Sequence, residues 1–406
     1  MAATKKTATD KKVSTTKKVT TKPKQTDFSD LKVAIVHDWL PLIAGAERVL
    51  EQITQVFPGA DIYTLFDFLD DDQRKMFGES KIHASYLNKW PKVKKYYRKL
   101  LPFCPQAIED FDLSEYDLIV SSSHAVAKGV ITGAEQIHVS YVHSPTRYAW
   151  DLMHQYLRES NMNKGIKGYV AKKLLHKFRI WDYRTANGVD SFIANSDYIR
   201  KRIWKVYRRD AEVIYPPVNI DTFEYADKKE DFFLTASRMV PYKRIDLIAS
   251  AFAKRPELKL KIIGDGPEMS KIKNIAEFTP NIEILGFQST DVLKDHMQRA
   301  RAFVFAAEED FGIIPVEAQA CGTPVIAYGA GGALETVIDY EQNPQKATGI
   351  FFNEQTPDDL ADALARFDKV SAKIKPKNCR KNAEKFAPEV FRNELIKTVQ
   401  NAIKQK

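Results

Sequence analysis

Two glutamates eight residues apart, in the stretch Glu309-Asp-Phe-Gly-Ile-Ile-Pro-Val-Glu317, have the spacing and surroundings of a ligand site. Pro315 suits the first position of a helix, where its missing N–H has no partner to lose. This start predicts Glu309 on a loop and Glu317 in the first helical turn, with free backbone N–H groups from Phe311 to Val316 between them. Carboxylates accept hydrogen bonds from hydroxyls, and helix N-termini attract anions. The stretch therefore suits a ligand with hydroxyls and phosphate; acidic residues that only complement the helix dipole are the alternative.

A basic pair follows the apolar run 232–237, which reads as a buried strand. Arg238 offers a planar fork of donors to phosphate oxygens, and Lys243 offers a compact positive charge. Both residues would leave the carboxyl end of a strand, where open α/β sheets bind their ligands. The pair is therefore predicted to hold a phosphate-bearing ligand.

Two glycine-containing turns complete this pattern, Ile262-Ile-Gly264-Asp-Gly266-Pro267 and Gly329-Ala-Gly331-Gly332-Ala-Leu-Glu335. Together with the two stretches above, they resemble the nucleotide-sugar half of a glycosyltransferase family 4 enzyme. The resemblance extends from about Leu31 to the C-terminal helix. It implies the α/β GT-B fold, in which two Rossmann-like domains face each other across a cleft. It also implies transfer of a hexose with retention of stereochemistry.

On this resemblance, Arg238 and Lys243 would neutralise the diphosphate of a nucleotide sugar as the glycosidic bond breaks. Glu317 would hold the ribose hydroxyls, and Glu309 would hold the donor sugar. The remaining residues expected to bind the donor are Gly45, Gly264, Phe311, Gly312 and Ile313. Because no Asp-x-Asp motif directly follows a predicted strand, neither a divalent metal nor another cofactor is expected.

Alternating apolar runs and helical patterns predict a parallel, doubly wound sheet in each half of the chain. The predicted strands are 32–36, 61–65, 117–122, 137–142 and 191–194, then 232–236, 258–263, 282–285, 302–306, 323–327 and 349–352. Pro216 and Pro217 end any preceding helix and mark a boundary. The predicted domains are an acceptor domain at 28–214 and a nucleotide-sugar domain at 215–387. By resemblance, a helix at 388–406 returns to the first domain.

Small and basic residues follow the predicted strands of the first half. Gly45 lies in a turn after the first strand and matches one of the two glycines usual in the family; a plain tight turn is the alternative. His124 follows the strand 117–122, so it would sit at the ligand-binding edge of the sheet. Histidine can bind a sugar hydroxyl or accept a proton near neutral pH. A lone histidine there is often structural, but the resemblance implies an active-site role for His124.

The run 139–151 combines His143, Arg147 and Tyr148, residue types that suit a carbohydrate site. These three residues are expected to bind the acceptor, although Arg147 could instead pair with Asp151 four residues on. The run is similar to bacterial O-antigen-type mannosyltransferases. It implies GDP-mannose as the donor and a glycan or lipid-linked acceptor in cell-surface polysaccharide synthesis. UDP-sugars are an alternative donor class.

The basic charge of the chain is concentrated at its N-terminus. Residues 1–25 carry eight lysines and one aspartate, which is +7 of the formal net charge of +9. This composition predicts a disordered tail at 1–27, which could also bind nucleic acid or anionic lipid. Three dispersed cysteines favour reduced thiols in the cytoplasm. No apolar run approaches roughly 20 residues, and no signal-peptide pattern is seen.

The stretch 89–101 holds six basic residues and no acidic one. If a helix begins at Pro91, one stripe holds Val93, Tyr97, Leu100 and Leu101, with lysines largely opposite. This pattern is typical of an interfacial helix on anionic lipid, at the inner face of the cytoplasmic membrane; a solvated helix packed on the sheet is the alternative. A second basic, aromatic region is 198–209. No nucleic-acid-binding module is recognisable, so nucleic acid is not an expected partner.

Two other classes of protein compete with the transferase hypothesis. One is another GT-B enzyme, either a sugar-nucleotide epimerase or a phosphorylase, although no pyridoxal lysine signature is found. The other is a non-catalytic scaffold that binds membrane or nucleic acid through the tail and the basic stretches. A Rossmann dehydrogenase is disfavoured because no Gly-x-Gly-x-x-Gly follows the first strand.

Overall fold

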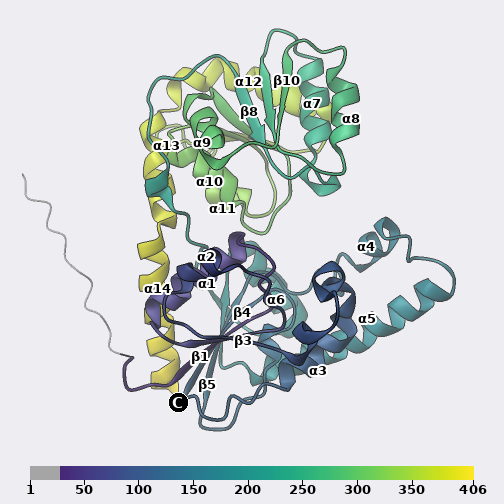
Figure 1. The fold of residues 1–406 in the computed structure, drawn as a ribbon. Helices are drawn as coiled ribbons and strands as arrows, with labels where there is room; N and C mark the ends of the chain where they lie inside the picture. The colour runs from purple at the N-terminus through teal and green to yellow at the C-terminus, as the bar shows by residue number, and fades with distance from the viewer. Residues whose placement is uncertain (1–27) are drawn as a thin grey trace, which may run out of the picture.

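The computed structural model describes residues 28–406, and the tail expected at 1–27 lies outside the described residues. Two parallel sheets form, one in each half of the chain, with helices packed on their faces (Figure 1). The first sheet has the order β3-β2-β1-β4-β5-β6-β7, and the second has β10-β9-β8-β11-β12-β13. Every strand pairing is parallel. Both orders run outward from a central first strand, as in Rossmann folds. The expectation of two Rossmann-like α/β domains is confirmed.

The strands are short, and the central ones are almost fully buried, as expected of parallel sheets with both faces covered. Those of the first sheet are β1 (Val33–His37), β2 (Asp61–Thr64), β3 (Ile82–Ala84), β4 (Leu118–Ser123), β5 (Ile137–Val142), β6 (Ser191–Ala194) and β7 (Ala211–Val213). Those of the second are β8 (Phe233–Ala236), β9 (Leu260–Ile263), β10 (Ile282–Gly286), β11 (Ala302–Phe305), β12 (Val325–Tyr328) and β13 (Gly349–Phe352). Sequence patterns missed the edge strands β3 and β7, because each has only three residues and neither is an apolar run.

Helices connect the strands. In the first half they are α1 (Gly45–Val56), α2 (Asp71–Arg74), α3 (Cys104–Glu109), α4 (Met153–Glu159), α5 (Gly165–Thr185) and α6 (Asp197–Tyr207). In the second half they are α7 (Ile245–Ala253), α8 (Met269–Ala276), α9 (Thr290–Arg299), α10 (Ile313–Ala320), α11 (Ala333–Thr336), α12 (Pro357–Val370), α13 (Pro376–Ala383) and α14 (Pro388–Gln405).

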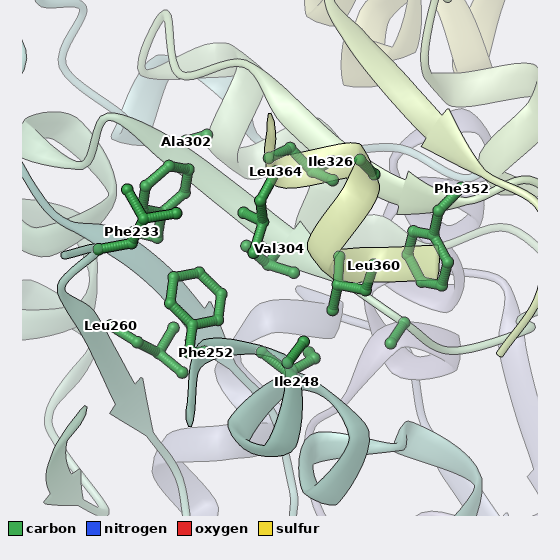
Figure 2. Packing of buried hydrophobic residues seen from close by; sticks show 14 of the residues in the cluster. Phe233, Ile248, Phe252, Leu260, Ala302, Val304, Ile326, Phe352, Leu360 and Leu364 are labelled. Atoms are coloured by element: carbon green, nitrogen blue, oxygen red, sulfur yellow. The ribbon is translucent and has the colours of Figure 1, made fainter. Parts of the chain in front are cut away.

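One of the two core clusters of the second domain lies between its sheet and the helices α7 and α12. Figure 2 shows Phe233 of β8 and Phe252 of α7 close together beside Leu364 of α12. The rings of Phe233 and Phe252 meet edge to face, with centroids 5.3 Å apart. This packing fixes the position of β8 and β11, the two strands whose carboxyl ends carry the predicted donor residues.

The last helix, α14, packs on the first domain. It runs alongside α1 at the edge of that domain (Figure 1). Its residues Phe391, Leu395, Val399 and Ala402 recur at helical spacing and are buried in the first core. The ring of Phe391 lies 5.6 Å from that of Tyr141 in β5. The C-terminal segment therefore completes the hydrophobic core of the N-terminal half.

The expected interfacial helix at 89–101 is wrong. This stretch forms short 3-10 helices, Tyr86–Lys89, Val93–Lys95 and Tyr97–Phe103, in place of one α-helix. The proposed lipid-facing residues Val93, Tyr97 and Leu100 are buried in the first domain. Leu101 is partly buried against the same cluster. The apolar stripe thus packs against the protein, and the basic residues Lys94, Lys95, Arg98 and Lys99 between its members face solvent. Among the helices of residues 28–406, none is long and apolar enough to cross a membrane.

Candidate active site

Lys243 and Glu309 form an ion pair at the carboxyl edge of the second sheet. Lys243 ends the 3-10 turn Pro241–Lys243 after β8, and Glu309 lies on the loop after β11. Their side chains are 17% and 19% exposed, so both charges are largely removed from water. Burial and the neighbouring cation of Arg147 lower the pKa of Lys243 to about 8. The nearby Arg238 is exposed.

Helix α10 begins two residues earlier than expected. Its first residue is Ile313, and Gly312 precedes it with a φ of 85°, a left-handed conformation that glycine adopts without strain. Pro315 is therefore the third helical residue; its missing N–H is still tolerated there, because the first four N–H groups have no helical partner. Glu317 falls in the second turn, not the first.

Glycines allow the loops around this edge to pack closely. A Cβ on Gly332 would lie 2.3 Å from Phe311 Cα, and Gly332 N donates to Glu309 O at 2.8 Å. In the same way, a Cβ on Gly264 would lie 1.9 Å from Ser237 O, next to Arg238. Both glycines hold loops that carry predicted donor residues. A donor contact of Gly264 itself stays a prediction.

Glu317 is half-buried and faces the first domain. Burial raises its pKa to about 7, and the positive charges of Arg48 in α1 and Lys294 in α9 only partly oppose this rise. The starts of α1 and α10 also meet: a Cβ on Gly45 would be 3.1 Å from the Cδ1 of Ile313. Two predicted donor residues from different domains are therefore neighbours.

A buried acid–base cluster stands at the carboxyl edge of the first sheet. Asp38, directly after β1, accepts hydrogen bonds from the backbone N–H groups of residues 124–127 at 2.5 to 2.9 Å. Its Oδ2 lies 3.0 Å from His124 Nδ1. Burial alone would raise the pKa of Asp38, but His124 and these N–H groups lower it. Burial alone would likewise lower the pKa of His124, and the Asp38 carboxylate raises it.

Two more histidines share one serine in the same cluster. Ser122 Oγ lies 2.8 Å from His143 Nε2 and 3.1 Å from His37 Nδ1. Burial, together with the neighbouring histidines, holds the pKa of His143 well below its usual value, so this ring is neutral at pH 7. His37 Nε2 is buried without a hydrogen-bond partner, 3.8 Å from Glu47 Oε1. An unpaired buried nitrogen at a sheet edge is a candidate contact for a ligand hydroxyl.

Sequence reasoning selected His124 and His143 but missed His37, Asp38 and Glu47. The signal was available, because His37-Asp38 ends the first strand, the same position that singled out His124. Tyr148 lies with the helices α4 and α5, where its ring contacts those of Tyr156 and Phe178.

A charged contact joins the two domains beside Glu309. Arg147, after β5, pairs with Asp310, which follows Glu309. Arg202 of α6 lies 3.5 Å from Asp310 and pairs with Asp151 at 2.6 Å. The alternative pairing of Arg147 with Asp151 is therefore wrong, because each has a different partner. Arg147 therefore links the loop after β5 directly to the loop after β11.

Backbone groups reinforce this contact. Glu335 accepts hydrogen bonds from Asp197 N and Tyr198 N at the start of α6, at 2.7 and 3.0 Å. Ser196 Oγ donates to Asp310 O at 2.5 Å. Loops that carry predicted site residues, from both sheets, therefore meet at one interface. No group of three or more His, Cys, Asp or Glu within residues 28–406 is arranged to hold a metal ion.

Comparisons with known proteins agree with this architecture. Residues 43–222 match the family model "Glycosyltransferase Family 4", and residues 219–386 match "Glycosyl transferases group 1". An uncharacterized glycosyltransferase of Methanocaldococcus jannaschii is 30% identical over 49% of this chain and 55% of its own length. The alpha-1,3/1,6-mannosyltransferase of Kluyveromyces lactis is 26% identical over 45% of this chain and 47% of its own length. The chain spans about half the length of the curated relatives it matches.

Solved structures resemble nearly the whole chain. Sucrose-phosphate synthase from Thermosynechococcus elongatus superposes with a TM-score of 0.67 at 16% identity, covering 92% of this chain and 99% of that one. The Anabaena protein HepE, in complex with UDP-glucose, gives a TM-score of 0.63 at 19% identity, covering 91% and 99%. One glycosyltransferase family model matches each half of the chain, and the chain has the GT-B fold.

Proposed function

We propose that this chain is a retaining hexosyltransferase that moves mannose from GDP-mannose to a glycan or lipid-linked acceptor in cell-surface polysaccharide synthesis. It would act in the cytoplasm, at the inner face of the membrane. The observation that carries the proposal is the buried pair of Lys243 and Glu309 at the edge of the second sheet. A nucleotide sugar offers both residues a better partner. Its diphosphate can bind the Lys243 ammonium, and its hydroxyls can donate hydrogen bonds to the Glu309 carboxylate.

Three cations contribute to this chemistry. Arg238 is exposed and has no ion pair within the described part of the chain, so its guanidinium is free to join Lys243 on the diphosphate. Arg147 stands close enough to lower the pKa of Lys243. Positive charge at the departing diphosphate stabilises the transition state, and removing one such group typically costs about 10²–10³ in rate.

The first domain supplies polar groups from the opposite side. Asp38 favours the protonated form of His124, which can then donate to a sugar oxygen. His37 adds an unpaired nitrogen beside it. On the donor side, Glu317 is proposed to bind the ribose hydroxyls; a carboxyl group that is half protonated near pH 7 can both accept and donate such bonds. No carboxylate suggests itself as a covalent nucleophile, and none is proposed.

Mannose and guanosine are supported by the likeness to the mannosyltransferase of Kluyveromyces lactis and by the run 139–151. The complexes of HepE with UDP and UDP-glucose favour a UDP-sugar as the second candidate. D-inositol 3-phosphate glycosyltransferases, such as that of Mycobacterium avium at 26% identity, suggest that the acceptor itself can carry phosphate. Donor and acceptor are therefore separate questions for experiment.

The test is release of nucleoside diphosphate from a panel of GDP- and UDP-sugars in the presence of EDTA. The wild type is compared with Lys243→Ala and Glu317→Ala, and with Lys254→Ala, which removes an exposed lysine. We expect one donor to be turned over, a loss of about 10²-fold or more in the two site variants, and no loss in the control. Absence of both turnover and calorimetric donor binding would contradict the proposal and favour the scaffold alternative.

A further inference from the structure

Helix α5 presents an apolar face to solvent. Ile166 is 84% exposed and Tyr169 is 67% exposed, and Val170, Ile180 and Tyr183 are also exposed. We call these five residues the α5 face. Their spacings are close to whole numbers of helical turns, so they lie on one side of the helix. Large exposed side chains gathered on one helix face are typical of an interaction surface.

The opposite side of α5 is anchored in the first domain. Phe178 is buried in the core, and Asp182 pairs with Lys128 Nζ at 2.8 Å, both side chains being almost fully buried. Lys128 belongs to the loop after β4 that also carries His124. The helix α4 and the first half of α5 project beyond the body of the domain (Figure 1). The α5 face is therefore held firmly and is sterically accessible.

Lysines surround the α5 face without acidic partners. From Ser160 to Trp181 the sequence contains no Asp or Glu. Lys164, Lys167, Lys173 and Lys177 are exposed, and none of them forms an ion pair with a described residue. A surface that combines aliphatic and tyrosine side chains with unpaired lysines matches the boundary between acyl chains and anionic headgroups.

We propose that the α5 face and its lysines dock on an anionic lipid bilayer. Ile166 and Tyr169 would enter the headgroup region while the lysines contact lipid phosphates. A second copy of the same surface is a poor partner, because two faces without acidic residues repel each other. Nucleic acid would be attracted by the lysines alone, whereas an anionic bilayer would also bind the apolar side chains. A contribution of the apolar side chains to binding therefore distinguishes a bilayer from nucleic acid.

The first experiment is sedimentation of the full chain with phosphatidylcholine vesicles that contain or lack phosphatidylglycerol. The variants are Ile166→Ser with Tyr169→Ser, and Lys167→Gln with Lys173→Gln. Phe278→Ser is the matched control, since Phe278 is 86% exposed but lies in the second domain. We expect binding only to the anionic vesicles, weakened roughly tenfold by the apolar pair and roughly 25-fold by the lysine pair, and unchanged in the control.

The N-terminal tail is present in every variant, so its lysines cannot account for differences between them. If both double variants bind the anionic vesicles as tightly as the wild type, the proposal is overturned. A loss in the lysine pair alone would also overturn it, because a purely electrostatic surface fits nucleic acid. Turnover of a soluble donor should be equal in all these proteins, so failure of the docking proposal is distinguishable from failure of the transferase proposal.

A second readout follows insertion directly. The native cysteines Cys104, Cys321 and Cys379 are buried, so a thiol dye will label an engineered Ile166→Cys selectively. With anionic vesicles, a polarity-sensitive dye at this position should shift its emission to the blue, while the same dye on Phe278→Cys should not. Vesicle-bound protein without a shift at position 166 would contradict docking through α5.

Discussion

The carboxylate of Asp38 lies 3.0 Å from Nδ1 of His124 and simultaneously caps four backbone N–H groups of the loop that carries this histidine. One buried side chain therefore sets both the position and the charge of His124. Neither residue acts alone, because the N–H groups keep Asp38 ionised and the ionised Asp38 favours the imidazolium.

Asp38→Asn should lower the pKa of His124. With the carboxylate gone, burial is the dominant remaining effect, and burial disfavours the charged ring. NMR titration of the histidine Cε1–H signals measures the shift, with the other histidines as internal references. The loop also loses charge-assisted hydrogen bonds, at a cost of about 1–3 kcal/mol in the free energy of unfolding. An unchanged His124 pKa in a folded variant would show that the pair has no electrostatic coupling.

Asp310→Asn should loosen the contact between the domains. Arg147 would keep its charge but lose its ionic partner, and both side chains are largely buried. We expect a larger radius of gyration by small-angle X-ray scattering and a roughly 10–100-fold lower kcat/KM, because a displaced Glu309 loop misplaces the donor. The matched control is Asp151→Asn, which removes a partner of Arg202 within the first domain. Equal scattering of the two variants would exclude a specific role for Asp310 in domain contact.

Glu317→Gln should stabilise the folded chain at pH 8 but not at pH 5. The pKa of Glu317 is about 7 when folded and near 4.5 when unfolded, so between these values the folded state holds an extra proton. Stability therefore falls as pH rises from about 4.5 to 7, by up to about 3 kcal/mol. Urea unfolding at both pH values measures this difference.

Glu354→Gln, at an exposed position of the second domain, is the control for that pH series. Nucleotide binding by Glu317→Gln should weaken even as stability rises, because binding residues are often placed at a cost in stability. A variant with the same stability gain at both pH values would contradict a carboxyl group whose pKa is raised by burial.

Gly332→Ala should weaken donor binding more than it weakens the fold. The backbone of Gly332 is in an ordinary helical conformation, so the added methyl acts only through its 2.3 Å approach to Phe311 Cα. The loop carrying Glu309 must move to relieve this clash, at a cost of about 1–3 kcal/mol. Calorimetry with the nucleotide sugar measures the effect. Gly188→Ala, where a Cβ meets nothing within 4 Å, should behave as wild type.

Local patterns predicted the parts of this structure that depend on local physics. Central strands such as Ala302–Phe305 are short apolar runs, which are typical of a parallel sheet buried on both faces. The position of His124 followed in the same way from the end of a strand. Helix α10 begins earlier than predicted because Gly312, just before it, has a left-handed backbone conformation. A sequence pattern alone does not say whether a glycine will adopt that conformation.

Partners distant in sequence could not be predicted. Arg147 had an acidic residue four positions away, but its partner is Asp310 in the other domain. The stretch 89–101 has the composition of a helix that binds a membrane surface. Only the tertiary structure shows that its apolar residues pack in the core of the first domain. Helix α5 has a weaker amphipathic pattern than the stretch 89–101, because its apolar residues and lysines lie on the same side. Its apolar residues nevertheless stay exposed to solvent.

The packing of α14 on the first domain has a consequence for synthesis in the cell. Phe391, Leu395 and Val399 are almost completely buried in a core whose members outside helix α14 all lie before residue 215. While a ribosome synthesises the second domain, this core lacks the buried residues of helix α14. At roughly 5–20 residues per second, the wait is on the order of ten to forty seconds. The nascent first domain is therefore a natural client for chaperones, and a stop codon that removes only the last helix would leave the earliest-made domain unfinished.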